Sequence, residues 1–96
     1  MKPSEAMRLH RNAIRRVVET NDARNPRVFG SALHGTDTEK SDLDILVDGT
    51  AKLSLLKLAR MTRLLESQLG VKVDVLTPED LPGSFRQSVL AEAVAI

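Results

Sequence analysis

The fold is decided by residues 30–48, which read GSALHGTDTEKSDLDILVD. The second half of this stretch predicts a strand over residues 42–48, because Leu43, Ile45 and Val47 recur at every second position. Asp42 and Asp44 then share the opposite face of the same strand. One face is expected to pack on a core, and the other must meet solvent or a ligand.

The flanking residues predict helices and further strands around this segment. In order along the chain, we expect a helix over 4–20 capped by Ser4, a loop over 21–26, a short strand over 27–29, a loop or helical turn over 32–40, the strand over 42–48, a helix from 53 to the stop signal at Gly70, a strand over 71–76, a helix-start sequence over 77–80 and a last helix opened by Ser84. The predicted fold class is α+β, with a small mixed sheet and helices packed on one face.

Three carboxylates stand out within the predicted strands. Asp42 and Asp44 lie at i and i+2, so their Cα atoms are about 7 Å apart on one face. Asp74 faces away from the valines of its own strand, and it joins the pair if the two strands are neighbours. Three such charges repel one another unless hard cations lie between them, and Mg²⁺ prefers oxygen ligands of this kind. The alternative is that all three residues are structural. Asp42 would cap a turn, Asp44 would be a solvated strand residue, and Asp74 would be an edge-strand charge that discourages aggregation.

The turn at Gly30 and Ser31 offers free backbone N–H groups and a hydroxyl donor. Because Gly30 has no Cβ, phosphate oxygens can approach the main chain closely. The turn is not a Walker A loop, since no Gly-Lys-Ser/Thr sequence follows it. An ordinary turn remains the alternative for this pair of residues taken alone.

Composition excludes several classes of protein. The 96 residues are expected to form one domain over 1–96. Basic and acidic residues nearly balance at +1, and the chain has two Phe with no Trp or Tyr, which argues against direct nucleic-acid binding. The absence of Cys excludes disulfides and thiolate metal sites. No membrane span or signal peptide is present, so we expect a cytoplasmic protein.

The whole spacing, Gly30-Ser31, Gly35 and then Ser41-Asp42-Leu43-Asp44, closely resembles the signature of the DNA polymerase beta-like nucleotidyltransferase superfamily. It is most similar to the smallest members, the minimal nucleotidyltransferases of antitoxin type. The resemblance covers nearly the whole chain, since residues 71–81 are similar to the family's third-carboxylate strand and residues 90–94 to its last helix. It implies the polymerase beta-like palm as the fold.

The resemblance also implies a reaction and a set of site residues. Family members transfer a nucleoside monophosphate, here AMP from ATP, to an acceptor hydroxyl and release pyrophosphate, with two Mg²⁺ ions expected. Asp42 and Asp44 would bind magnesium, and Asp74 would bind the catalytic ion and help to deprotonate the acceptor. Gly30 and Ser31 would hold the β- and γ-phosphates. Ser41 would complete the site by shaping the turn that leads into the metal-binding strand.

The sequence departs from the family pattern in one respect. Minimal nucleotidyltransferases commonly have Arg after the Gly-Ser pair and again before the second Gly, where this chain has Ala32 and His34. A solvated His is mostly neutral at pH 7, so fixed positive charge is missing there. Lys40 or an arginine of the first helix could supply it instead.

The resemblance implies a partner as well. Many minimal nucleotidyltransferases are antitoxins that adenylylate a tyrosine of an all-helical HEPN ribonuclease toxin, which predicts a hetero-oligomer with such a partner. A second possibility is a binding-only antitoxin whose weakened phosphate turn reflects lost catalysis. A third is small-molecule adenylylation, as of an aminoglycoside, with a separately encoded helical subunit supplying the acceptor pocket.

Overall fold

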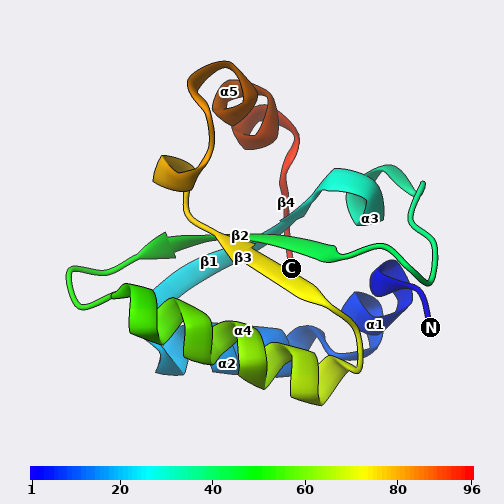
Figure 1. Ribbon diagram of the computed structural model, residues 1–96, viewed down its shortest axis with the longest axis horizontal. Coiled ribbons are helices and arrows are strands. Elements are labelled where there is room, and N and C mark those ends of the chain that lie inside the picture. The colour runs from blue at the N-terminus through cyan, green and yellow to red at the C-terminus, as the bar shows by residue number, and fades with distance from the viewer.

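The computed structural model describes residues 1–96 and contains one four-stranded sheet with helices on both sides (Figure 1). The elements in chain order are α1 (Pro3–Leu9), α2 (Arg11–Thr20), β1 (Ala23–Phe29), α3 (Gly30–His34), β2 (Leu43–Gly49), α4 (Leu55–Leu69), β3 (Val73–Leu76), the 3₁₀ helix η1 (Pro78–Asp80), α5 (Gly83–Glu92) and β4 (Val94–Ala95). The strand order is β3-β2-β1-β4. β2 runs parallel to β3, and β1 runs antiparallel to both β2 and β4. The predicted α+β class with a mixed sheet is confirmed.

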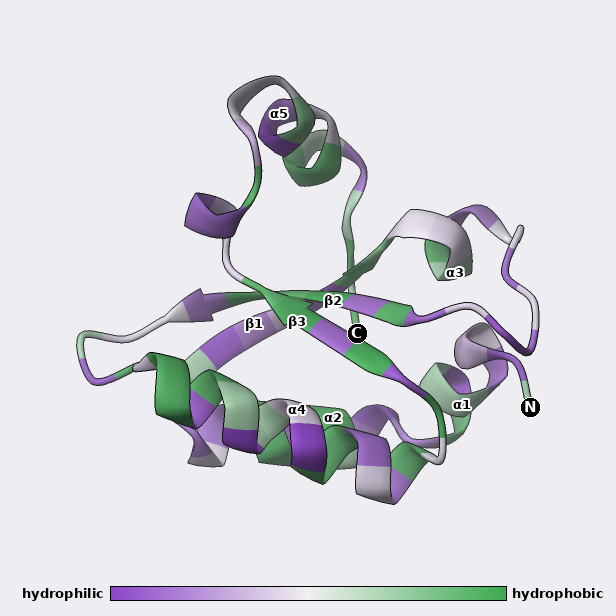
Figure 2. Ribbon diagram, in the orientation of Figure 1, coloured by the Kyte–Doolittle hydropathy of each residue, from purple (hydrophilic) through white to green (hydrophobic).

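The two long helices, α2 and α4, cover one face of the sheet (Figure 1). The main core lies between them and the strands, and it includes Leu43, Ile45 and Val47 of β2, all fully buried. Figure 2 shows that the strands carry both hydrophobic and hydrophilic residues. In β2 the residues buried in this core recur at every second position. The predicted inward face of β2 is therefore confirmed.

The expectation that the helices pack on one face of the sheet is wrong for the last helix. α5 stands over the opposite face of the sheet, together with η1 (Figure 1). A second, smaller apolar cluster fixes it there, formed by Phe29, Leu46, Leu81 and Val89. By the period of two, Leu46 lies on the same face of β2 as Asp44. Its burial with Val89 of α5 explains why an apolar residue stands on that face.

The N-terminal helix is shorter than its apolar pattern predicts. It is broken at His10 into α1 and α2, and Ser4 lies inside α1 instead of capping it. The cap comes from a distant loop, since Asp37 accepts hydrogen bonds from the Ser4 backbone N–H at 2.8 Å and from the Ser4 hydroxyl at 3.2 Å. Asp37 is 6% exposed. Burial acts to raise the pKa of its carboxyl, but the bonds from Ser4, a bond from its own backbone and the charge of Lys2 together outweigh burial and lower the pKa.

Two other boundaries differ from the sequence expectation. The predicted loop over 21–26 is wrong from residue 23 onward, because β1 begins at Ala23, which pairs with Gly49 of β2. The register shifts by one residue between Arg24 and Arg27, and this bulge admits Pro26 into the strand. The last helix begins at Gly83 after Pro82, with no side-chain cap from Ser84. No helix of the structure is long and apolar enough to cross a membrane.

The Asp37 cap predicts a measurable loss of stability when it is removed. Asp37→Ala should lower the free energy of unfolding by about 1 kcal/mol, which lowers Tm by roughly 4–8 °C in a domain of this size. Because the folded-state pKa of Asp37 lies below its ordinary value, the contribution is complete above pH 4 and is lost as the pH falls through the folded-state pKa. Thermal unfolding followed by circular dichroism measures both effects. Glu39→Ala, an exposed carboxylate of the same loop, is the control, and an equal loss in the two variants would contradict the cap.

Candidate functional site

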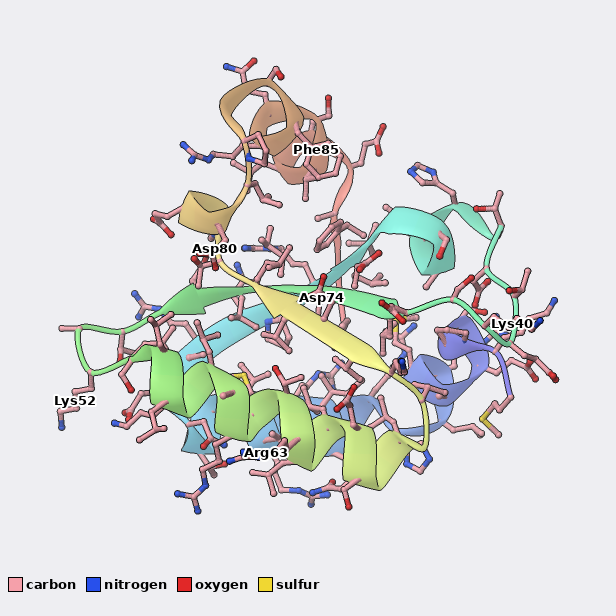
Figure 3. All side chains as sticks on the ribbon, in the orientation of Figure 1. Lys40, Lys52, Arg63, Asp74, Asp80 and Phe85 are labelled. Atoms are coloured by element: carbon pink, nitrogen blue, oxygen red, sulfur yellow. The ribbon has the colours of Figure 1, made fainter.

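The acidic face of the sheet is built by the parallel pairing of β2 with β3. Asp44 and Asp74 are register partners, and so are Leu43 and Val73 one position earlier. Register partners point to the same side of a sheet, so Leu43 and Val73 enter the main core while Asp44 and Asp74 face away from it. Figure 3 shows Asp74 on β3 on the side of the sheet where α5 lies. Asp42 directly precedes β2 and is exposed.

The charges of these carboxylates act on one another. Asp44 is half-buried, and its pKa is raised to about 6 by burial first, and then by the charges of Asp74 and Asp42. As the side chains stand, no three His, Asp or Glu residues are gathered closely enough to form a metal-binding cluster. The chemistry of the donors nevertheless fits a hard divalent cation, because three carboxylates carry negative charge that the protein leaves uncompensated.

The carboxylates of Asp42, Asp44 and Asp74 form the acidic row of the sheet. The glycine of the Gly-Ser turn lies directly against one of them, Asp44. Gly30 follows β1 with a φ of +71°, and a Cβ on it would overlap Oδ2 of Asp44 and lie 3.2 Å from its Cγ. Phe29, the residue before it, is the register partner of Asp44 on β1. The backbone of the turn and the Asp44 carboxylate therefore share one small space that no other residue type at position 30 would leave open.

A pocket of about 340 Å³ opens at this point between the sheet and α5. Its sheet side includes Gly30, Ser31 and Asp44, and its helix side includes Phe85 and Ser88. The sequence interpretation found the first three and missed the helix side. The only available signal was the spacing of residues along the last helix, and that spacing does not reveal which face of the sheet the helix covers.

Asp42 borders a neighbouring pocket of about 550 Å³, which it shares with Lys40 and Lys72. The structure thus brings Asp44, Gly30 and Ser31 into one pocket and places Asp42 in the next one along the sheet. The hydroxyl of Ser41 accepts a hydrogen bond from the Thr38 backbone N–H at 2.9 Å. Ser41 therefore closes the turn that leads into β2.

The two residues that depart from the family pattern, Ala32 and His34, have different surroundings in the structure. Ala32 is buried in the main core, so its side chain points away from the pocket. His34 lines the pocket, and its Nε2 lies 3.0 Å from Oε2 of Glu92 on α5. Lys40 lies beside Asp42, whereas the arginines of α2 are on the helix that covers the other face of the sheet. Of the charge sources considered from sequence, the structure keeps Lys40 near the carboxylates.

A parallel-paired carboxylate row beside a glycine-serine turn defines a class of nucleotide-transferring site, and comparisons with known proteins agree. A family model described as a nucleotidyltransferase domain matches residues 11–96. The protein adenylyltransferase MntA of Thermococcus cleftensis is 41% identical over 69 residues, which are 72% of this chain and 70% of that protein. The chain therefore belongs to the nucleotidyltransferase domain family and is a nucleotidyltransferase.

Solved structures support the fold. One described as a "putative minimal nucleotidyltransferase" superposes with a TM-score of 0.87 at 38% identity, covering 97% of this chain and 95% of that one. Two toxin–antitoxin structures, one with AMP-PNP and one named MntA-HepT, give TM-scores of 0.74 and 0.69 at 24% and 21% identity. They cover 88% and 92% of this chain and 69% of each of those chains. The minimal nucleotidyltransferase fold expected from the sequence is confirmed.

The electrostatics of β2 predict opposite effects for two aspartates of one strand. Asp44 has a folded-state pKa of about 6, above its unfolded value, because its charge is buried and is repelled by Asp74 and Asp42. Its ionisation therefore lowers stability increasingly from about pH 4 to pH 6 and fully above pH 6. Asp44→Asn should therefore raise the free energy of unfolding at pH 7.5 in EDTA, with the gain shrinking as the pH falls toward 4.

Asp48 is the matched control for that substitution. Arg27 donates from Nη2 and Nη1 to its two carboxylate oxygens at 3.0 and 3.2 Å, and these bonds, with one from Asn25, lower the pKa of Asp48. Its contribution is present above pH 4 and is lost as the pH falls below that value, so Asp48→Asn should lower stability at pH 7.5. Urea unfolding across this pH range measures both variants. Destabilisation by Asp44→Asn at pH 7.5 would show that the carboxylates do not repel.

The close approach of Gly30 to Asp44 gives a third prediction. Gly30→Ala and Gly35→Ala should both lose roughly 1–2 kcal/mol, because both glycines have φ near +70°. Only Gly30→Ala forces the Asp44 carboxylate to move, since nothing lies near a Cβ at Gly35. NMR titration should therefore show a changed Asp44 pKa in Gly30→Ala and an unchanged one in Gly35→Ala. A common value in both variants would contradict the contact.

Proposed function

We propose that this chain, acting as one domain over residues 1–96, transfers AMP from ATP to a hydroxyl of a partner protein and releases pyrophosphate. The observation that carries the proposal is the contact between the open backbone of Gly30 and the carboxylate of Asp44, which is paired in register with Asp74. A phosphate-binding turn and one carboxylate of a row suited to magnesium, that of Asp44, thereby share one pocket. The identity to a named protein adenylyltransferase supports ATP as the nucleotide.

The residues of the acidic row would bind the magnesium ions, and one of them would also accept a proton. Asp42, Asp44 and Asp74 would hold two Mg²⁺ ions, which activate an attacking hydroxyl and stabilise a leaving pyrophosphate. Asp74, the exposed member of the register pair, would accept the proton of the incoming hydroxyl. The half-buried Asp44 lies deeper, against the turn.

The glycine-serine turn would bind the phosphates. The backbone N–H groups at Gly30 and Ser31, together with the Ser31 hydroxyl, would donate to the β- and γ-phosphate oxygens. Ser41 has a supporting role, since its hydroxyl closes the turn that positions Asp42. Lys40 and Lys72 line the pocket of Asp42 and would supply positive charge there.

The proposed partner is a helical toxin of HEPN type, with a tyrosine as the acceptor. The relatives support this choice, because one is named a protein adenylyltransferase and structures with the same fold are toxin–antitoxin complexes named MntA-HepT. The protein would act as the antitoxin in a hetero-oligomer in the cytoplasm, where ATP and magnesium are plentiful.

A binding-only antitoxin is the second candidate function. The observation that favours it is the phosphate turn, where Ala32 is buried and His34 is engaged with Glu92. No arginine or lysine lines the pocket that contains Gly30 and Ser31. In this version the chain masks its partner by contact, without transferring a nucleotide.

Transfer of a labelled phosphate from ATP to the partner protein distinguishes the two candidate functions. The chain is incubated with Mg²⁺, a HEPN-type toxin as the candidate partner, and ATP labelled at either the α- or the γ-phosphate. We expect α-label, and no γ-label, on a partner tyrosine, because nucleotidyl transfer retains the α-phosphate. Asp42→Ala and Asp44→Ala should each reduce the transfer by at least about a hundredfold, as loss of a metal-binding or electrostatic group commonly does.

Glu19→Ala is the control variant, since Glu19 is an exposed carboxylate on α2, which covers the other face of the sheet. It should transfer label at the native rate. No transfer by the native protein, with inhibition of the partner retained in Asp42→Ala, would replace the enzymatic proposal with the binding-only one.

A further inference from the structure

The chain has only two aromatic residues, and both line the pocket that contains the Gly-Ser turn. Phe29 is buried at its base, in the small apolar cluster with Leu46 and Val89. Phe85 lies on α5 and is 51% exposed. An aromatic ring left half open beside a pocket presents a flat apolar surface that nothing else in the protein covers.

The position of Phe85 is set by the packing of α5. Val89 is buried against the sheet, which fixes the rotation of the helix about its axis. Residues 85, 88, 89 and 92 stand at i, i+3, i+4 and i+7, so they share one face of the helix. All four line the pocket. The hydrogen bond between His34 and Glu92 ties the far end of the same face to α3.

The pocket therefore has two chemically different sides. The Gly30–Ser31 turn and Asp44 offer N–H donors and a carboxylate, which suit phosphates and their cations. The α5 side offers the ring of Phe85 with a hydroxyl from Ser88. A pocket of about 340 Å³ is at the lower end of the range for small-molecule sites, so it suits part of a nucleotide and leaves the rest solvated. Figure 3 shows Phe85 and Asp74 on the same side of the sheet, with Phe85 on the helix above it.

We propose that Phe85 is the platform on which the nucleobase of the bound triphosphate stacks, with α5 forming the base side of the site and the Gly30–Ser31 turn the phosphate side. This inference rests on the proposed function, because it places the nucleotide that the reaction would consume. Stacking on an aromatic ring contributes to the binding of any base, since every base has a π-face. Phe85 thus strengthens the binding of ATP and GTP alike, and it supplies affinity at a site whose phosphate turn lacks arginine.

The test compares a nucleotide with a ligand that has phosphates and no base. Isothermal titration calorimetry of the full chain in Mg²⁺ measures Kd for ATP, for GTP and for inorganic tripolyphosphate. In Phe85→Ala we expect the affinity for ATP and for GTP to fall about tenfold, in line with the loss of one stacked base, and the affinity for tripolyphosphate to stay unchanged. Phe85→Tyr should keep native affinities because it keeps the ring.

Leu90→Ala is the matched control. Leu90 is 47% exposed on the same helix but does not line the pocket, so its removal should leave all three affinities unchanged. The melting temperature of each variant shows whether it folds. If Phe85→Ala does not fold, Phe85→Leu takes its place, because it keeps an apolar side chain without the ring.

Each other outcome overturns the inference. Equal losses for ATP and tripolyphosphate would mean that Phe85 supports the fold of the pocket and does not stack on the base. Unchanged affinities, with partner binding lost, would make Phe85 a docking residue while leaving the proposed function intact. A native protein that binds neither ATP nor tripolyphosphate would remove the proposed function itself.

Discussion

The burial of the inward face of β2 is the constraint on which the rest of the structure depends. Leu43, Ile45 and Val47 are fully enclosed beneath α2 and α4. Three such side chains contribute about 5–9 kcal/mol in total at 1.5–3 kcal/mol each. A register slip of one residue would expose all of them and turn Asp44 into the core, so the register is strongly specified. The same burial holds Asp44 beside Asp74 against their mutual repulsion.

The position of the acidic row is therefore set by the packing of the core beneath it. The raised pKa of Asp44 shows that the fold tolerates charge where charge is unfavourable. Such tolerance is common at functional sites, where perturbed carboxylates perform binding or proton transfer. Asp48, further along the same strand, has its charge compensated by Arg27, so the repulsion is confined to one end of β2.

On the opposite face of the sheet, this small chain forms a pocket between the sheet and its own last helix, α5. Four apolar residues hold α5 above the sheet, and the space between them and the Gly-Ser turn becomes the pocket. The turn lacks the arginines that the family commonly has, and Lys40 and Lys72 line the pocket of Asp42 instead. An aromatic surface at the other side of the pocket offers binding energy of a different kind.

The sequence by itself determined the features that depend on short-range patterns. The period of two in residues 42–48 set the two faces of β2, and the Gly70 stop signal set the end of α4, where Gly70 has a φ of +73°. The spacing from Gly30 to Asp44 predicted the site and the family. These signals are local, since the physical cause lies within a few residues of the effect.

Only the tertiary structure decided the features that join distant residues. The strand at Ala23 exists because it pairs with Gly49, and α1 is capped by Asp37 from another part of the chain. The burial of Ala32 and the pairing of His34 with Glu92 follow from where α3 and α5 pack. No local pattern contains such contacts, because each is stabilised by a partner that the chain brings near only once the sheet has formed.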